Sequence, residues 1–407
     1  MINCLQAKEN KEDTWVIRLE EKFIDYLKQH CEVLFLICIS LLGIAMRYTG
    51  RDFISDDYTI YLGGWYEQIK DLGGFKALEF QVGNYNILYQ MIIAFLTYLP
   101  IEPLYAYKLV SCIGDFFLAA GCGLLACEVC KNKNRGLFLT VYSVVLIMPT
   151  MVMNSAYWAQ CDSLYVSFII FALVDILKGK NHRAFILLGI ALALKFQMIF
   201  VLPFLLFFYV LNKKYSIFHF LWVLVVAMLT TLPAIVYGRG WFVLFQIYWA
   251  QHSENPHMTM NYPNIWAIMG GDYTTNKPYA VFLVIAILGI GLFLLVKKNY
   301  RVDNTVHFMS LLIWTVWTCL MFMPVMHERY GYLLEVLLVV MCFMNVKKYW
   351  IFGAGIVTST LLTYSHYLYG AEINLRLIGV ACFLLYCAYT FDYFSASLKE
   401  KETLQAT

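Results

Sequence analysis

The chain has 407 residues, of which 61% are hydrophobic and only 14% are charged, with a formal net charge of +3. A soluble domain carries about 25% charged residues, so this composition excludes an ordinary soluble protein and indicates a polytopic membrane protein. No basic face with interleaved aromatic residues is present, so nucleic acid is not an expected partner.

The N-terminal region lacks the features of a cleavable signal peptide. Residues 1–32 are polar and mixed in charge, with no short apolar core followed by small residues. We therefore expect a cytoplasmic N-terminal segment at 1–32, a membrane domain at 33–395 and a C-terminal tail at 396–407.

Twelve apolar stretches are predicted to be membrane spans, for which about 20 apolar residues are typical. They lie at 33–49, 104–128, 136–153, 163–177, 184–196, 198–211, 217–237, 278–296, 306–324, 329–345, 348–366 and 375–391. The fifth and sixth stretches are short and meet at Lys195-Phe-Gln197, which indicates a tight or broken hairpin.

Basic residues gather at alternate junctions between these spans, and cytoplasmic loops attract Lys and Arg. The basic junctions lie at 131–135, 178–183, 213–214, 297–301 and 347–348. The loops predicted on the opposite face lie at 154–162, 195–197, 238–277, 324–330 and 364–374. Residues 85–101 are apolar but short. A crossing there makes thirteen spans and a cytoplasmic first loop at 50–84; we expect an interfacial or re-entrant path and an extracytoplasmic loop.

The first loop carries a cluster of acids. Residues 51–66 place Asp52, Asp56 and Asp57 beside a run of aromatic residues. Charge close to the hydrocarbon boundary is costly and usually functional, although a solvated loop explains any one of these acids alone. The cluster and its neighbours favour an active site.

Two polar motifs lie between predicted spans on the same face. Asn154-Ser-Ala-Tyr-Trp-Ala-Gln-Cys-Asp-Ser163 brings Gln160 and Asp162 to a depth at which each polar side chain needs a partner. Lys195, next to Gln197, is surrounded by apolar residues. It either snorkels to the interface or binds an anion such as a phosphate as a point charge.

Two further motifs follow. Asn261-Tyr-Pro-Asn-Ile-Trp266 predicts a shaped loop, because Pro restricts the residue before it. Met323-Pro-Val-Met-His-Glu-Arg-Tyr330 includes Arg329, which can grip a phosphate bidentately. Glu328 can pair with Arg329, and His327 is either a hydrogen-bond donor to substrate or a helix-end residue. A carboxylate together with cationic and amide donors is what transfer from a phosphate to a hydroxyl requires.

Several of these motifs occur together in one order. The first-loop motifs are Ser55-Asp-Asp-Tyr58, Trp65-Tyr66, Lys70, Gly73-Gly-Phe-Lys-Ala-Leu78 and Gly83-Asn-Tyr-Asn86. The later motifs are Asn154 to Ser163, Ala193-Leu-Lys-Phe-Gln197, Asn261 to Trp266 and Met326-His-Glu-Arg-Tyr330. Together they resemble bacterial mannosyltransferases related to eukaryotic GPI mannosyltransferase II, in the GT-C superfamily. In the motif from Asn154 to Ser163, Ala159 stands where that family usually has Gly. Dolichyl-phosphate glucosyltransferases of N-glycan assembly resemble the chain more distantly.

The resemblance implies an all-α GT-C fold of about 12–13 transmembrane helices, with amphipathic helices in the external first loop. It implies inverting transfer of a hexose, mannose or glucose, from a polyprenyl-phosphate donor to a hydroxyl of a lipid-linked or cell-envelope glycan acceptor. The expected location is the bacterial plasma membrane, with the site facing outside. Asp57 corresponds to the family's Asp before Tyr and is the expected general base, with Asp56 as the alternative.

The other site residues follow from the same resemblance and from their positions on one face. The donor phosphate is expected to contact Lys195, Arg329, His327 and Gln197. Substrate contacts are expected from Trp65, Gln160, Asp162, Asn264, Trp266 and Glu328. No cofactor or protein metal site is predicted, because Cys127 and Cys130 form a lone CxxC without a second pair; a divalent metal ion is left open.

Two other functions remain open. A transporter or flippase of lipid-linked saccharides also has broken helices and intramembrane charges. Against it, we find no internal symmetry, and the polar motifs gather on one face rather than at the midplane. A structural subunit of a membrane complex is the third hypothesis, and it would tolerate the loss of Asp57.

Overall fold

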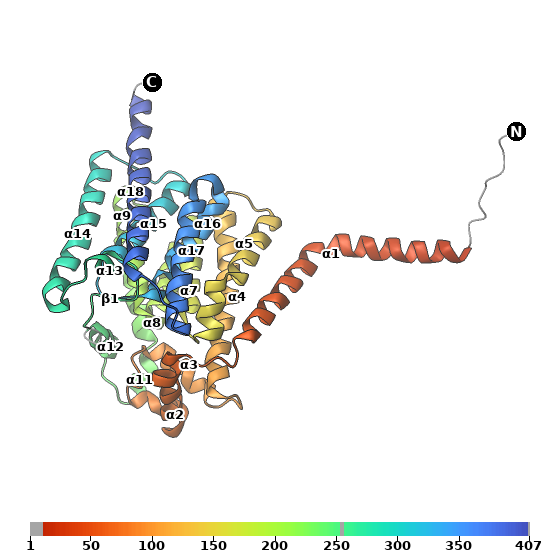
Figure 1. The fold of residues 1–407 in the computed structure, drawn as a ribbon, viewed down its shortest axis with the longest axis horizontal. Helices are drawn as coiled ribbons and strands as arrows, with labels where there is room; N and C mark the ends of the chain where they lie inside the picture. The colour runs from red at the N-terminus through yellow and green to blue at the C-terminus, as the bar shows by residue number, and fades with distance from the viewer. Residues whose placement is uncertain (1–10, 253–255, 406–407) are drawn as a thin grey trace.

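The computed structural model describes residues 11–252 and 256–405 and consists almost entirely of helices (Figure 1). About 80% of it is helical, which confirms the all-α prediction. Residues 1–10 of the predicted N-terminal segment, 253–255 of the predicted 238–277 loop and 406–407 of the predicted tail lie outside the described residues.

The first helix joins two predicted regions. α1 (Lys11–Thr49) runs without interruption from the N-terminal segment through the first predicted span. Figure 1 shows its N-terminal half projecting away from the helix bundle.

The first loop and the segment after it fold into short helices. η1 (Tyr58–Leu62), α2 (Gly63–Asp71) and η2 (Gly74–Glu79) lie in the loop, and α3 (Ile87–Leu96) follows it. α3 lies within residues 85–101, the segment for which a membrane crossing is one of the two alternatives. Its 10 residues rise about 15 Å, half of the roughly 30 Å hydrocarbon core. α3 alone is therefore too short to cross a membrane.

Five helices within the described chain are long and apolar enough to cross a membrane. They are α1, α4 (Pro103–Val129), α14 (Tyr273–Lys297), α15 (Thr305–Phe322) and α18 (Leu375–Gln405). A bent pair makes a sixth candidate: α5 (Arg135–Ile147) is followed by α6 (Pro149–Val152) and η3 (Met153–Tyr157), with a bend of 53°. Pro149 accounts for the break, because the residue before a Pro is pushed out of the helical region.

The remaining predicted stretches contain helices that are shorter or less apolar. They are α7 (Asp162–Leu177), α8 (Asn181–Leu194), η4 (Phe196–Val201), α9 (Leu202–Asn212), η5 (Ile217–His219), α10 (Phe220–Leu229), α11 (Leu232–Val236), α16 (Tyr332–Met344) and α17 (Val346–Tyr369). Length and composition thus support five to six membrane spans, which is fewer than the twelve to thirteen predicted. The predicted break at Lys195 is confirmed: its backbone is extended, with φ −153° and ψ 135°.

Close helix packing holds the start of α7 in place. α4 lies against α7, and small residues let such helices approach closely. A Cβ atom added at Gly114 of α4 would lie 2.6 Å from the Ser163 hydroxyl oxygen. Ser163 in turn donates a hydrogen bond of 3.0 Å to the carbonyl of Ser111. This contact fixes the first turn of α7, where Asp162 lies.

Several short elements lie between the longer helices in the sequence. They are α12 (Val243–His252), β1 (Thr259–Met260), α13 (Ile265–Met269), β2 (Met326–His327) and η6 (Glu328–Gly331). β1 and β2 pair in parallel, with Met260 opposite His327. Figure 1 shows α2, α3, α11 and α12 together at the end opposite the C-terminus. Residues of the first loop and of the later polar loops line one cavity. Their common side of the membrane stays a prediction.

Candidate active site

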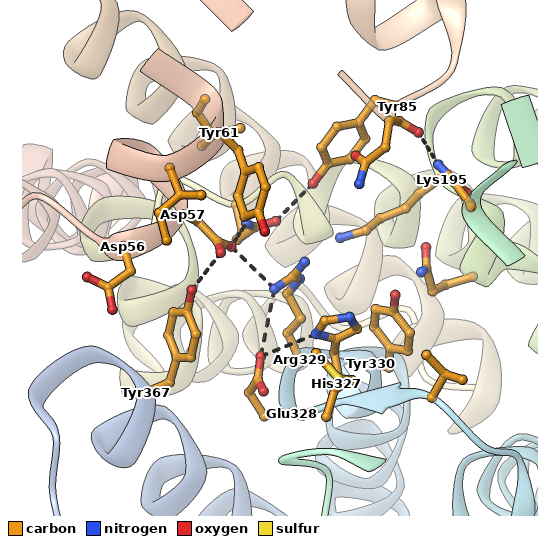
Figure 2. A pocket seen from close by; sticks show the side chains of 18 of the residues that line it. Asp56, Asp57, Tyr61, Tyr85, Lys195, His327, Glu328, Arg329, Tyr330 and Tyr367 are labelled. Atoms are coloured by element: carbon orange, nitrogen blue, oxygen red, sulfur yellow. Dashed lines mark hydrogen bonds and ion pairs between the residues drawn. The ribbon is translucent and has the colours of Figure 1, made fainter. Parts of the chain in front are cut away.

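A cavity of about 490 Å³ lies among these loops (Figure 2). Most of the predicted site residues line it: Asp56, Asp57, Trp65, Gln160, Lys195, Gln197, His327, Glu328 and Arg329. Three predicted site residues, Asp162, Asn264 and Trp266, do not line it. The cavity therefore collects side chains from the first loop, from the turn after η3, from the break between α8 and η4 and from the segment after α15.

Asp57 is the most heavily hydrogen-bonded carboxylate of the cavity. Its Oδ2 accepts hydrogen bonds from Trp158 Nε1 at 2.8 Å and from Gln160 Nε2 at 2.5 Å. Its Oδ1 accepts one from the Tyr367 hydroxyl at 2.6 Å. Arg329 Nη1 approaches Oδ2 at 3.4 Å. The side chain is 13% exposed, so the carboxylate is held rigidly and still reaches the cavity. Asp56, by contrast, is exposed, and Figure 2 shows it pointing away from this cluster.

Two buried side chains fix the backbone that carries Asp57. The Ser55 hydroxyl donates to the Trp158 carbonyl at 3.1 Å. Lys108, which is 5% exposed, donates from Nζ to the carbonyls of Gly50, Arg51 and Phe53 at 2.6, 3.0 and 2.5 Å. All three ammonium protons are thus used on the segment between α1 and Asp56. The position of Asp57 follows from this anchoring.

The turn after η3 aims two donors at Asp57. Ala159 lies between Trp158 and Gln160, and its φ of +63° is in the left-handed region. This reversal brings the side chains on either side of Ala159 to the same carboxylate oxygen. A non-Gly residue pays about 1–2 kcal/mol for this conformation. A Gly at this position would adopt the conformation without that cost.

Lys195 forms a buried ion pair. Its Nζ lies 2.5 Å from Asp162 Oδ1, and the two side chains are 6% and 0% exposed. Asp162 Oδ2 also accepts a hydrogen bond from Asn154 Nδ2 at 3.0 Å. Asp162 stands in the first turn of α7, where the helix dipole favours a negative charge. Its role in the structure is to hold Lys195 at the cavity wall, and the expected direct substrate contact is not supported.

Arg329 lies between two carboxylates. Its Nη1 is 3.4 Å from Asp57 Oδ2 and 3.7 Å from Glu328 Oε1, and its guanidinium lies 5.2 Å from the centre of the Trp158 ring. Its buried Nε has no hydrogen-bond partner in the described chain. Lys195 and Arg329 thus each contact a carboxylate of the protein. Arg329 nevertheless keeps donor capacity for a further anion.

Burial changes the protonation of the two residues before Arg329. Burial raises the pKa of Glu328 to about 7, although the positive charge of nearby Arg329 lowers the same pKa. Burial, together with the charges of Arg329 and Lys195, lowers the pKa of His327 well below its usual value. His327 is therefore a neutral imidazole near pH 7, and it can donate only one hydrogen bond.

The Asn261 to Trp266 motif has a structural role at this end of the bundle. Asn264 caps α13 by accepting hydrogen bonds from the amides of Trp266 and Ala267, and it donates to the Met323 carbonyl. Trp266 Nε1 donates to the Phe322 carbonyl at 2.8 Å. Both side chains are buried away from the cavity, so their expected substrate contacts are not supported. Their bonds fix the loop that follows α15.

Strained backbone surrounds the cavity. Asn261 and Val325 line it with φ of +63° and +61°, and Ala159 lies beside it. A β-branched residue such as Val is rare in this region. Such strain costs about 1–3 kcal/mol per residue. Of the residues named here, Val325 is the one for which this conformation is most unusual.

Two tyrosines complete the site and were not predicted as site residues. Tyr367, on α17, donates to Asp57. Tyr85 donates to Gln160 Oε1 at 3.0 Å and packs edge-on against Trp65, with ring centres 5.9 Å apart. Tyr85 belongs to the Gly83-Asn-Tyr-Asn86 motif, so the sequence offered a reason to include it among the site residues. Tyr367 stands in an aromatic helix end where nothing in the sequence separates it from its neighbours.

No metal site accompanies these side chains in the described part of the chain, where no group of three or more His, Cys, Asp or Glu side chains is placed to hold an ion. The cavity offers an ionisable acceptor of protons, two cations and several amide and hydroxyl donors. Comparison with protein-family models and with curated proteins finds no match to this chain. The GT-C resemblance therefore remains a prediction from motifs.

Proposed function

We propose that the protein is an integral-membrane glycosyltransferase that moves a hexose from a polyprenyl-phosphate donor to a hydroxyl of a lipid-linked or cell-envelope glycan. The motif resemblance, with mannose or glucose as the expected sugar, and the cavity chemistry support this proposal together. The cavity would face the outside of a bacterial plasma membrane, since the basic junctions occupy the other side.

One observation carries the proposal: a buried carboxylate and two cations line a single cavity. Asp57 lies at one wall, and Lys195 and Arg329 contribute positive charge from two other segments. Lys195 Nζ has three protons, and its only ion pair in the described chain is with Asp162. Arg329 has an unpartnered Nε. These donors are suited to a phosphate, which guanidinium and ammonium groups bind by charge-assisted hydrogen bonds.

The reaction can be written with these side chains. The acceptor oxygen forms a bond to the sugar C1 as the bond from C1 to the phosphate oxygen breaks. The electron pair leaves with the polyprenyl phosphate, which Lys195 and Arg329 stabilise. Asp57 takes the proton of the attacking hydroxyl. Attack from the face opposite the phosphate inverts the configuration at C1.

The test uses purified protein in lipid nanodiscs with polyprenyl-phosphate mannose or glucose and glycolipids extracted from the native host. A radiolabelled sugar that becomes attached to a glycolipid in wild type, and not after Asp57→Asn, supports the proposal. The transporter alternative predicts movement of a labelled lipid-linked saccharide across proteoliposomes without a new glycosidic bond. That result, without transfer in any assay, would reject the enzyme proposal.

A further inference from the structure

The charges around the cavity do not balance if every carboxylate is ionised. Asp57 contacts Arg329, and Asp162 contacts Lys195. Glu328 is a third carboxylate, and it shares Arg329 with Asp57 at a distance of 3.7 Å (Figure 2). Asp56 is exposed on the rim, where water solvates its charge. Three buried carboxylates therefore face two cations, and an anionic ligand would add a further negative charge.

Glu328 is the carboxylate with the weakest support for a charge. It is 2% exposed, and its buried Oε1 accepts no hydrogen bond from any described residue. The backbone amide of Glu328 and the side chain of Asn261 each provide one hydrogen bond to the carboxyl group. An ionised carboxylate buried with an unpaired oxygen is costly, whereas a protonated carboxyl carries its own donor.

The groups that face Glu328 come from four parts of the chain. On its own segment they are His327, with Nδ1 at 4.0 Å, Arg329 and Tyr330. Asp57 faces it from the first loop, Asn261 from the β1 side, and Tyr364 and Tyr367 from α17. Arg329 is the cation among these groups, and Asp57 opposes a second negative charge. The raised pKa of Glu328, about 7, agrees with this arrangement.

We propose that Glu328 carries a proton when the cavity takes up its anionic ligand, and that its neutral carboxyl donates a hydrogen bond to that ligand. The inference rests on the proposed function, which supplies the phosphate. With Glu328 protonated, the remaining two carboxylates balance Arg329 and Lys195. The anion then enters a group of side chains without net charge instead of one with an excess negative charge, so its binding is coupled to one proton on Glu328. That proton is taken up from solution when the pH lies above about 7.

The test measures binding of farnesyl methyl phosphate, a phosphodiester whose single charge does not titrate near neutral pH, by calorimetry with purified protein. If Glu328 must be protonated, wild type binds about thirtyfold more weakly at about pH 8.5 than at about pH 6. Glu328→Gln mimics the neutral carboxyl, so its affinity should vary by less than about twofold over the same interval. Glu335→Gln is the matched control. Glu335 is also almost fully buried, bonds the Thr150 hydroxyl and does not line the cavity. This variant should keep the thirtyfold dependence.

The outcomes separate the inference from the function on which it rests. Binding by wild type without pH dependence overturns the inference, as does a folded Glu328→Gln variant that loses binding at every pH. Failure of wild type to bind the diester at any pH rejects the phosphate site itself. If Glu328→Gln does not fold, calorimetry of wild type in two buffers of different ionisation enthalpy decides. Uptake of one proton per ligand near pH 8 supports the inference, and no uptake overturns it.

Discussion

Replacing Asp57 with Asn should remove a base and leave its surroundings nearly unchanged. The amide oxygen can accept from Trp158 and Gln160 in place of Oδ2, and the amide nitrogen can donate to the Tyr367 hydroxyl, which turns to accept. Three short charge-assisted hydrogen bonds then become neutral ones, and the contact with Arg329 loses its negative partner. Each of the four loses about 1 kcal/mol, so the free energy of unfolding should fall by at most about 4 kcal/mol.

The effect on transfer should be larger. Removing a general base slows a reaction at least ~100-fold, which raises the activation free energy by about 2.7 kcal/mol. The assay is hexose transfer from the polyprenyl-phosphate donor by purified variants, with thermal unfolding as the check on folding. Asp56→Asn is the matched control. Asp56 is exposed, so its replacement should change the rate by no more than about twofold.

Transfer at the wild-type rate by Asp57→Asn would refute the assignment of the base. If Asp56→Asn is then the slow variant, the two acids exchange roles, and the hydrogen bonds of Asp57 are structural. If the double variant is also as fast as wild type, the base lies outside this doublet and the site is wrong.

Three further predictions use other features of the site. Arg329→Lys keeps the charge and loses the planar fork, so the apparent donor affinity should weaken about tenfold or more at normal protein levels; a wild-type KM would contradict phosphate binding by Arg329. Ala159→Gly relieves the left-handed backbone and should raise the free energy of unfolding by about 0.5–1 kcal/mol, whereas Ala172→Gly, within α7, should lower it by about 1 kcal/mol. Calorimetric unfolding tests this pair, and a Tm for Ala159→Gly at or below wild type opposes the strain argument. Cysteine at the exposed Glu67, in a Cys-depleted background, should react with an impermeant maleimide in intact cells. Labelling only after permeabilisation would place the first loop in the cytoplasm.

Residue chemistry in short motifs predicted much of the site. Asp57, Gln160, Lys195 and Arg329 were each recognised as polar groups out of place in an apolar chain, and all four line one cavity. Membrane burial makes this signal strong, because a charge near the hydrocarbon region persists only with a reason. The prediction did not extend to Tyr367. A chain with 30 Tyr residues gives no contrast in which one of them stands out.

The same reasoning did not separate residues that contact a substrate from residues that build the loop. Asn264 and Trp266 share a polar motif with cavity residues, yet their donors and acceptors are used by backbone groups of α13 and α15. Asp162 was predicted for substrate and instead pairs with Lys195. Hydrogen-bond capacity is visible in a sequence, but the partner that uses it depends on the tertiary arrangement.

The span count was also only partly accessible to sequence. Hydropathy identified every long apolar helix, and the bend at Pro149 splits one of the predicted stretches. Several other stretches form helices of 10–17 residues. Such helices are stabilised by neighbouring helices within the bundle, so composition alone does not decide whether each one crosses.

The hydrogen bond between Asp57 and Tyr367 joins residues that are 310 positions apart, and this separation has a consequence for biosynthesis. A ribosome adding about 5–20 residues per second takes about 15–60 s to travel between them. During that interval the nascent chain already contains the carboxylate, but not the hydroxyl that binds it. Synthesis and packing of α17 are therefore the steps that complete the Asp57 environment, and a chain that stops before α17 has most of its long apolar helices around an unfinished site.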